Sequence, residues 1–215
     1  LSKETQQKKD FHHLQEVINQ GMPVVLFDRI SNDIMCDKVI IDDQLAAYEA
    51  TNFLISKGLK KIALLTTVDY VSVGKLRTDG YLNVLHDHEI EVDESLIIRI
   101  EDTENCDEKI NELLENNSVD AILAVNELFA VTAIKLAMSK GIKIPEDLSV
   151  VAFTDGIISK YSTPTITTIS QNGIKMGRKA AEMLINRLEL EDEEDENYKT
   201  EIIETNLIIR ESTKS

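Results

Sequence analysis

Several polar side chains stand directly after short apolar runs, which is where ligands of a parallel sheet bind. Asn126 follows the run 121–125, and Thr154 and Asp155 follow the run 150–153. In an open α/β sheet, ligands lie just beyond the carboxyl ends of the parallel strands. An amide offers both a donor and an acceptor, which suits a hydroxyl group of a ligand. We therefore predict ligand contacts at Asn126 and Asp155, with capping of the next helix as the alternative for each.

Arg77 lies in the first turns of the helix predicted after the apolar run 62–65. Its planar guanidinium can hold two hydroxyl groups or one carboxylate at the same time. The alternative is a surface ion pair with Asp79 or another acidic side chain. Because its position is close to the predicted end of a strand, we expect Arg77 to bind ligand.

The segment His86-Asp87-His88-Glu89 has the residue types of a metal site. A zinc site needs three or four converging ligands, however, and the spacing identifies no third ligand here. The chain also lacks a G-x-S-x-G nucleophile elbow and a phosphate-binding loop. We therefore expect a solvated helix end, no metal, no cofactor and no catalytic residues, so the protein is not predicted to be an enzyme.

Short apolar runs alternate with segments of helical spacing along most of the chain. Such runs are typical of strands that a parallel sheet buries on both faces. The alternation predicts an α/β fold with doubly wound parallel sheets. Gly21, Gly58 and Gly141 are predicted to end helices. The predicted strands are 23–27, 39–41, 62–65, 96–100, 121–125, 150–153 and 200–209.

The composition excludes several classes of protein. A formal net charge of -16 argues against nucleic-acid binding by this chain alone, because Lys and Arg must neutralise the phosphates. The acidic run 189–196 carries part of this charge and is interpreted as a solvated loop. No apolar run reaches the roughly 18 residues of a membrane span. Two distant cysteines and no apparent leader indicate free thiols in a reducing compartment, and we expect a cytoplasmic location.

Several segments, taken in order, resemble the effector-binding core of the lactose-repressor/galactose-repressor (LacI/GalR) family of bacterial transcription regulators. Each segment is unspecific by itself, but the ordered set spans the chain from Leu1 to Ser212. The resembling segments are 23–29 (PVVLFDR), 50–58, 61–65, 77–81 (RTDGY), 120–127, 144–153 (IPEDLSVVAF), 164–171, 176–181 and 205–212 (TNLIIRES).

The resemblance implies a core like that of the periplasmic sugar-binding proteins, with two lobes and the effector in the cleft between them. It assigns residues 1–59 to a partial N-terminal lobe, to which 170–190 crosses back. Residues 60–169 and 198–215 then form the C-terminal lobe. The family's N-terminal helix-turn-helix and the first strands of the N-terminal lobe have no counterpart in this chain, and members usually form homodimers.

The resemblance also implies roles for individual residues. The Arg of the Arg-x-x-Gly-Tyr pattern, here Arg77, grips the effector in the family. Asp28 matches a position in the cleft, with a salt bridge to Arg29 or a turn cap as its alternative. Gln171 lies near a crossing between the lobes, where it either contacts ligand or satisfies backbone groups.

Two positions depart from the family pattern. Family members often carry an acidic ligand contact directly after the aromatic residue of the strand, where this chain has Thr154 and places Asp155 one position later. Either Thr154 replaces that carboxylate with a hydroxyl as a ligand contact, or the loop is shifted. Some relatives place a stacking aromatic residue where this chain has Gly173, and Tyr70 is a candidate to supply a ring instead. The effector identity of other members therefore does not carry over to this chain.

The resemblance predicts a ligand-sensing core of a transcription regulator, which binds a small molecule, a sugar or a derivative, and so modulates its grip on operator DNA. DNA contact would be made only through the absent N-terminal domain. The alternative is a periplasmic sugar-binding protein of a transporter, which shares the core architecture. The segment upstream of Leu1 distinguishes the two, since one carries a helix-turn-helix and the other a signal peptide.

Overall fold

The computed structural model describes the chain except for residues 9, 69–71, 102–104, 190–196 and 215. The chain divides into two compact units, which are described separately here. Unit 1 comprises Leu1–Asp42, Tyr70–Val73 and Gln171–Thr205. Unit 2 comprises Asp43–Asp69, Gly74–Ser170 and Asn206–Ser215.

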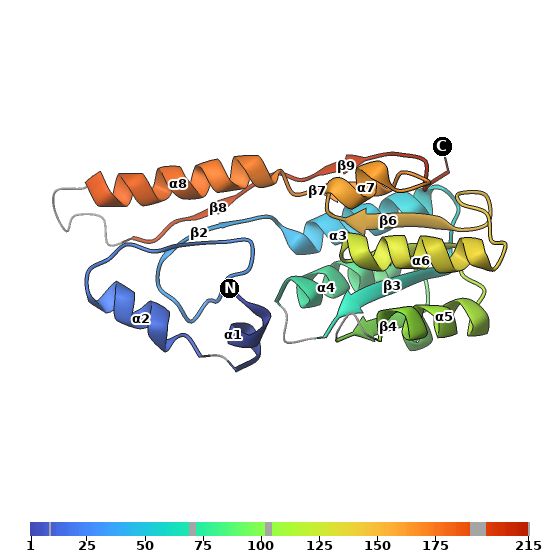
Figure 1. The fold of residues 1–215 in the computed structure, drawn as a ribbon, viewed down its shortest axis with the longest axis horizontal. Coiled ribbons are helices and arrows are strands. Elements are labelled where there is room, and N and C mark those ends of the chain that lie inside the picture. The colour runs from blue at the N-terminus through green and yellow to red at the C-terminus, as the bar shows by residue number, and fades with distance from the viewer. Residues whose placement is uncertain (9, 69–71, 102–104, 190–196, 215) are drawn as a thin grey trace. The chain divides into compact units, whose positions relative to one another are not determined.

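Unit 2 is built on a six-stranded sheet in the order β4-β3-β5-β6-β7-β9. Neighbouring strands are parallel except for β9, which runs antiparallel to β7 at one edge. The strands are β3 (Ile62–Thr67), β4 (Ile97–Ile100), β5 (Ala121–Ala124), β6 (Ser149–Phe153), β7 (Thr167–Ser170) and β9 (Asn206–Ile208). The predicted doubly wound α/β sheet is therefore present in this unit (Figure 1).

Helices connect the parallel strands of unit 2, as right-handed crossovers require. They are α4 (Ser72–Asp87), α5 (Cys106–Asn116), α6 (Glu127–Ser139) and α7 (Ile157–Tyr161), with a 3-10 turn η1 at Glu94–Leu96. Helix α3 (Asp43–Ser56) precedes β3. Gly58 and Gly141 follow α3 and α6 with φ of +80°, a conformation that glycine adopts without a Cβ clash.

The core of unit 2 lies on both faces of its central strands. Every residue of β5 and β6 is buried, as are five of the six residues of β3. Tyr81 on α4 is 1% exposed, and its hydroxyl donates to the Ile62 carbonyl at 2.8 Å. The aromatic ring thus packs against the sheet while its polar atom remains satisfied. Burial also raises the pKa of Tyr81.

Unit 1 has a smaller sheet of three parallel strands in the order β1-β2-β8. The strands are β1 (Val25–Phe27), β2 (Asp37–Ile40) and β8 (Thr200–Ile202), and the helices are α1 (Lys3–Lys8), α2 (His12–Asn19) and α8 (Gly173–Glu189). A small cluster of buried residues, Leu26, Ile34 and Cys36, packs with partly buried side chains that include Phe11 and Leu14.

Some observed boundaries differ from the predicted ones, and residues 198–205, expected in the C-terminal lobe, cluster with unit 1. The predicted strand 200–209 is two strands, because Ile203 still pairs with Ile40 whereas Asn206 pairs with Ser170 in the other sheet. Helix α3, expected in the N-terminal lobe, clusters with unit 2. Its Gln44 carbonyl lies so close to Gly80 of α4 that a Cβ there would come within 2.1 Å. Among the described residues, no helix is long and apolar enough to cross a membrane.

Candidate functional site

The carboxyl ends of β3, β5 and β6 lie next to one another, because these strands are neighbours in the parallel sheet of unit 2. The predicted residues Asn126, Thr154 and Asp155 follow the ends of β5 and β6, as the sequence indicates. Arg77 reaches the same edge from α4, since its Nη1 donates to the Val125 carbonyl at 2.7 Å. The structure thus brings four predicted residues to one edge of one sheet.

Arg77 is buried and held in place from three sides. Its Nε and Nη2 contact Oδ1 of Asp43 at 2.8 and 2.7 Å, and its guanidinium stacks over the Phe153 ring at 3.9 Å from the centroid. The predicted alternative of an ion pair is therefore present, but it is buried and its partner is Asp43 rather than Asp79. Such fixation sets the direction of the remaining N–H donors.

Asn126 caps helix α6, since its Oδ1 accepts a hydrogen bond from the Phe129 backbone N–H at 2.9 Å. The capping alternative is therefore confirmed for this residue. A cap of this kind uses the oxygen of the amide and leaves the NH2 group for another acceptor. A ligand contact through that nitrogen stays a prediction.

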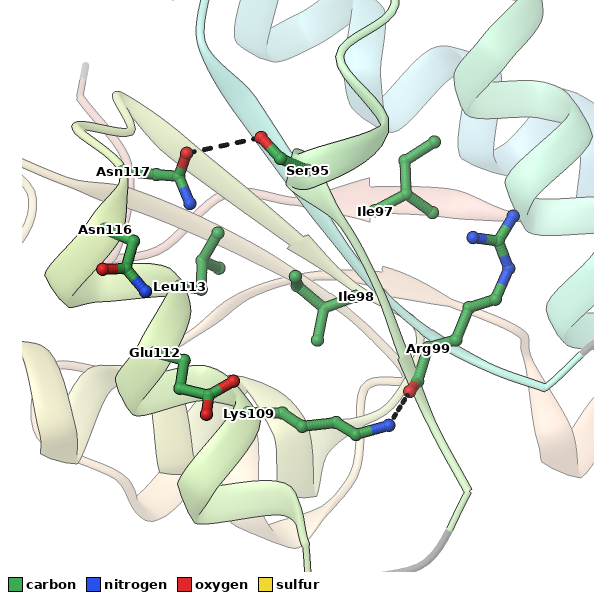
Figure 2. Close-up of a pocket in the computed structure, with 9 residues that line it drawn as sticks. All are labelled: Ser95, Ile97, Ile98, Arg99, Lys109, Glu112, Leu113, Asn116 and Asn117. Carbon is green, nitrogen blue, oxygen red and sulfur yellow. Dashed lines mark hydrogen bonds between the residues drawn. The ribbon is translucent and has the colours of Figure 1, made fainter.

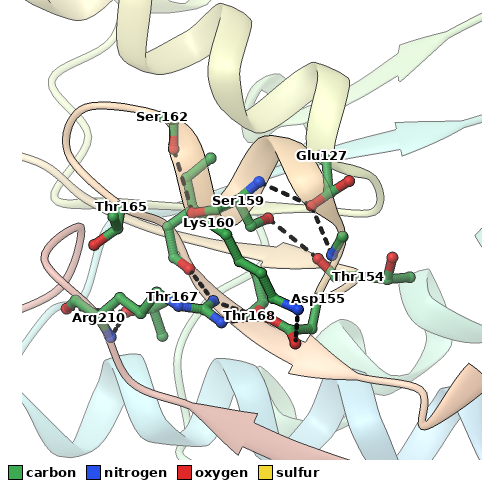
Figure 3. Close-up of polar contacts among 12 residues, drawn as sticks. Glu127, Thr154, Asp155, Ser159, Lys160, Ser162, Thr165, Thr167, Thr168 and Arg210 are labelled. Carbon is green, nitrogen blue, oxygen red and sulfur yellow. Dashed lines mark hydrogen bonds and ion pairs between the residues drawn. The ribbon is translucent and has the colours of Figure 1, made fainter.

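Asp155 belongs to a cluster of charged and polar groups that ties the end of the chain to the loop after β6 (Figure 3). It accepts a hydrogen bond from Arg210, pairs with Lys160 at 3.1 Å and accepts from the Thr168 hydroxyl at 3.3 Å. Arg210 donates further to the Ile166 carbonyl at 2.7 Å. The predicted capping role is wrong, because the cap of α7 is Gly156 with no side-chain bond.

These partners keep Asp155 ionised. Partial burial alone would raise its pKa, but the hydrogen bonds and charges of Arg210 and Lys160 outweigh burial and lower the pKa below its ordinary value. The carboxylate therefore acts as the anchor of an ion-pair network. Contact between Asp155 and a ligand remains a prediction.

Thr154 offers an unengaged hydroxyl at the same edge of the sheet. Its backbone carbonyl accepts from the Ser159 hydroxyl at 3.2 Å, whereas its side chain points away from the Asp155–Arg210 pair in Figure 3. The side chain is only half-buried. Thr154 therefore has the geometry of a ligand contact, which remains a prediction.

Glu127 is a residue of this edge that the sequence analysis did not single out. Its Oε1 accepts from the backbone N–H groups of Gly156 and Ser159 at 2.8 and 2.9 Å (Figure 3). A Cβ at Gly156 would lie 2.2 Å from the Glu127 carboxylate, so a larger residue there would displace the carboxylate from these two hydrogen bonds. An acidic residue after a strand, paired with a glycine after the next strand, is the signal that could have found it.

The other predicted residues lie in unit 1 or outside the described residues, and Gln171 directly follows the carboxyl end of β7, the parallel neighbour of β6. Asp28 lies in unit 1 with φ of +61° and a 3.6 Å contact to Arg29, so its salt-bridge alternative is present. Gln171 is half-buried at the start of a segment of unit 1. Tyr70 lies outside the described residues. Ligand contacts of these residues stay predictions.

The histidine-rich end of α4 forms ordinary side-chain contacts. Nδ1 of His86 lies 3.4 Å from Asp87, and Nε2 of His88 lies 2.7 Å from Oδ1 of Asn52. Within the part of the chain that the structure describes, no group of three or more His, Cys, Asp or Glu side chains could hold a metal ion. Both cysteines are free and buried, and burial raises the pKa of each thiol.

A pocket of about 320 Å³ lies between β4 and α5, away from the predicted residues (Figure 2). Ile97, Ile98 and Leu113 form its apolar wall. Lys109 crosses one end, where its Nζ donates to the Arg99 carbonyl at 2.6 Å. This contact covers a backbone acceptor of an edge strand, which protects the edge from pairing with other chains.

Residues 51–213 match the family model of the periplasmic binding protein-like domain. The chain is 31% identical to the ribose operon repressor of Haemophilus influenzae over 197 residues, which cover 91% of this chain and 58% of the repressor. It spans about half the length of the curated relatives it matches.

Solved structures agree with this assignment. The transcription regulator CcpA of Lactococcus lactis superposes with a TM-score of 0.82 at 29% identity, covering 95% of this chain and 74% of CcpA. The complex of the transcriptional regulator CelR with cellobiose gives a TM-score of 0.83 at 28% identity, covering 92% of this chain and 61% of CelR.

The fold and the matched segments together define the family to which this chain belongs. This chain belongs to the periplasmic binding protein-like domain family, and the proteins that it is similar to include LacI-family transcription regulators. The relatives named above are regulators and not enzymes, which confirms the prediction that this chain is not an enzyme.

Proposed function

We propose that this chain senses a small polyhydroxylated molecule, a sugar or a sugar derivative, for a transcription regulator. One observation carries the proposal: Arg77, Asn126 and Thr154 lie at adjacent strand ends of one parallel sheet. Arg77 is pinned by Asp43 and Phe153, so its donors are ordered before any ligand arrives. Preorganised donors lower the entropy cost of binding.

The three side chains offer complementary groups to a ligand hydroxyl. A guanidinium carries five N–H donors, and the contacts to Asp43 and Val125 leave a donor on each terminal nitrogen. The Asn126 amide adds donors beside its capping oxygen, and the Thr154 hydroxyl donates or accepts. Donors and acceptors side by side suit sugar hydroxyls better than a purely anionic ligand.

The regulatory mechanism proposed here is a population shift. A ligand that binds one arrangement of the core better than another shifts the equilibrium by its differential affinity. Operator DNA would be contacted by a domain that does not belong to this chain, because the chain itself carries a net charge of -16. Such a regulator works in the cytoplasm.

We also propose that the chain forms a homodimer through the exposed apolar face of α7. Ile157 and Tyr161 are 75% and 83% exposed, and Leu128 on the adjacent α6 is 41% exposed. A cluster of large apolar side chains on a small helix marks an interface. Sedimentation of the Tyr161→Asp variant checks this: a shift from dimer to monomer supports the face, and an unchanged dimer excludes it.

The ligand proposal is tested by thermal shift against D-ribose, cellobiose and further mono- and disaccharides. A ligand that binds only the folded protein raises its midpoint of unfolding by mass action. The Thr154→Val variant keeps the shape and removes the hydroxyl, so it should bind a stabilising sugar at least about tenfold more weakly, with an unchanged midpoint in its absence. Ten-fold corresponds to about 1.4 kcal/mol, the scale of one lost hydrogen bond to a ligand.

Thr163→Val provides a matched control. Thr163 is exposed in the loop that leads to the amino end of β7, at the opposite edge of the sheet, so sugar affinity should not change. Equal affinities of Thr154→Val and wild type would place the ligand elsewhere. No stabilisation by any sugar of the panel would contradict the proposed ligand class.

The alternative function is that of a periplasmic sugar-binding protein, whose core has the same architecture. The match to repressors along most of this chain favours the regulator. The sequence encoded upstream of Leu1 distinguishes them: a helix-turn-helix supports the regulator and a signal peptide supports the transport protein.

A further inference from the structure

Glu127 joins two neighbouring segments at the carboxyl edge of the sheet of unit 2. It is the first residue of α6 and directly follows Asn126, which caps the same helix. Its carboxylate reaches across to the segment after β6, where Oε1 accepts from the backbone N–H groups of Gly156 and Ser159 (Figure 3). A side chain that begins one strand-end segment thus holds the backbone of the next segment.

Gly156 and Ser159 are positions at the start of α7 whose N–H groups need an acceptor from outside that helix. The first N–H groups of a helix have no partner within it, and the N-cap Gly156 makes no side-chain bond. In a capping box, two side chains of the same helix satisfy the N–H groups of the N-cap and of the third helical residue. Here one carboxylate from α6 serves both. Glu127 therefore takes the place of a capping side chain for α7, although it lies 29 positions before Gly156.

The same bonds control the position of Thr154. Ser159 is 0% exposed, and its hydroxyl donates to the Thr154 carbonyl at 3.2 Å. Glu127 holds the backbone of Ser159, and Ser159 in turn holds the peptide group of Thr154. A fixed peptide group sets the direction of the Cα–Cβ bond, and a β-branched side chain has few rotamers around it. The direction of the Thr154 hydroxyl therefore depends on Glu127.

The other anchors of residues 154–156 come from different parts of unit 2. The Asp155 carboxylate holds the segment to Arg210 and Lys160. These partners lie after β9 and in α7, so neither ties the segment to the start of α6. Of the three anchors, only Glu127 directly follows Asn126. It therefore sets the spacing between the two strand ends that carry the proposed ligand contacts.

We propose that Glu127 is a positioning residue of the ligand site, which holds residues 154–156 against α6 and so fixes the Thr154 hydroxyl beside Asn126. This inference rests on the proposed function. Glu127 acts through Ser159 and Thr154 and does not itself touch the ligand, since its Oε1 is used by two backbone donors. A hydroxyl that is ordered before the ligand arrives binds at a lower cost in conformational entropy.

The first test needs no sugar. The Gly156 and Ser159 amides of the wild type should be protected from hydrogen exchange, measured by NMR, because both N–H groups are bonded. Glu127→Ala should raise their exchange rates about tenfold. Glu127→Gln should change them little, since its amide oxygen can accept the same two bonds. Equal rates in the wild type and in Glu127→Ala would overturn the proposal, because Glu127 would then not hold the segment.

Sugar affinity shows whether this order matters for binding. The probe is the sugar of the panel, D-ribose, cellobiose or another, that stabilises the wild type most. Glu127→Ala should bind it about fivefold more weakly, and Glu127→Gln within about twofold of the wild type. Glu146→Ala is the matched control, because Glu146 is exposed in the loop before β6 at the opposite edge of the sheet. A loss that is equal in Glu127→Ala and Glu146→Ala would contradict the proposal.

Double variants separate positioning from a general loss of stability. If Glu127 acts through Thr154, adding Glu127→Ala to Thr154→Val should weaken binding no further, because the hydroxyl that Glu127 positions is already absent. Additive losses would show that Glu127 acts by another route. Gly156→Ala pushes the carboxylate away from the other side and should reproduce the loss seen in Glu127→Ala, whereas unchanged affinity would count against the contact. The thermal midpoint of each variant verifies that the fold is retained.

The positioning role and the proposed function fail in different ways. If no sugar of the panel binds the wild type, the proposed function fails, while the exchange rates of Gly156 and Ser159 still decide whether Glu127 holds the segment. If a sugar binds the wild type and Glu127→Ala equally well, the ligand class stands and the positioning role is wrong.

Discussion

Strands β3 of unit 2 and β1 of unit 1 are both apolar and parallel to their neighbours, yet they are buried to different degrees. β3 lies between β4 and β5, and five of its six residues are buried. β1 pairs with β2 alone among the described strands, and its Phe27 is 54% exposed. An apolar run is therefore buried on both faces only where strands and helices cover it from all sides.

The ion pairs of the two units differ in the same way. In unit 2, Arg77 and Asp43 each expose 5% of their side chains. In unit 1, Arg187 exposes 16% while Asp37 exposes 4%. Asp37 also accepts a backbone bond from Lys199 at 2.7 Å. Both carboxylates are therefore buried, and the pair of unit 1 differs in its more exposed arginine. Four predictions test how far the two units differ.

The largest effect is expected from removing the buried arginine. Arg77→Met leaves Asp43 charged and buried, which should cost about 4 kcal/mol of the free energy of unfolding. Arg187→Met should cost about 2 kcal/mol, because Arg187 is more exposed and Lys199 still supports Asp37. Urea unfolding with hydrogen exchange, evaluated separately for each unit, measures both.

The double variant Arg77→Met with Asp43→Asn is the control for this prediction. It should recover much of the loss, because no uncompensated charge remains buried. Equal losses in the single and double variants would show that the stacking of Arg77 on Phe153, rather than its charge, stabilises unit 2.

Shortening a buried leucine should also destabilise unit 2 more than unit 1. Leu64 is 0% exposed in β3 and Leu26 is 8% exposed in β1. Leu64→Ala should destabilise by about 3 kcal/mol, because the rigid sheet around it cannot close the cavity. Leu26→Ala should cost about 2 kcal/mol or less, since fewer elements surround it. A larger loss for Leu26→Ala, measured by the same urea titration, would reverse the comparison between the units.

Replacing glycine by alanine should have opposite effects on stability at Gly156, where a Cβ meets a side chain, and at Gly177, where it meets nothing. Gly156→Ala sets a Cβ against the Glu127 carboxylate and should destabilise unit 2 by about 2 kcal/mol. Nothing lies within 4 Å of a Cβ at Gly177 of α8, so Gly177→Ala should stabilise by about 0.5–1 kcal/mol through its helix propensity. If both expectations hold, calorimetry shows a lower midpoint of thermal unfolding for Gly156→Ala and a higher one for Gly177→Ala.

The smallest effect is the pH dependence of the two anchored carboxylates. Burial opposes ionisation of Asp37, but Arg187 and the Lys199 N–H lower its pKa, as Arg210 and Lys160 lower that of Asp155. A lowered pKa stabilises the folded state above the ordinary Asp value of about 3.9, and this contribution is lost as the pH falls below it. Stability should therefore fall less between pH 6 and pH 3 in Asp155→Asn and in Asp37→Asn than in the wild type.

An unchanged pH dependence of stability in Asp155→Asn would mean that Arg210 and Lys160 do not lower the pKa of Asp155 in the folded state. Comparing the two variants shows which unit is responsible for the acid sensitivity of the protein. Urea titrations at both pH values provide the slopes.

The sequence alone determined most strands and helices and the edge of the sheet where polar residues gather. Apolar periodicity and helix-ending glycines are local signals, so Asn126 and Thr154 were placed correctly after β5 and β6. Only the tertiary structure decided the partners of the charged residues. Arg77 could have paired with several acids, and its actual partner Asp43 lies 34 positions away.

The split of 200–209 into β8 and β9 shows the same limit, because pairing with β2 or with β7 depends on which strand edge is near. The Asp155–Arg210 pair joins residues 55 positions apart. The physical reason is that local sequence sets the conformation of a segment, whereas the choice among many equal charges and strand edges is made by packing over long separations.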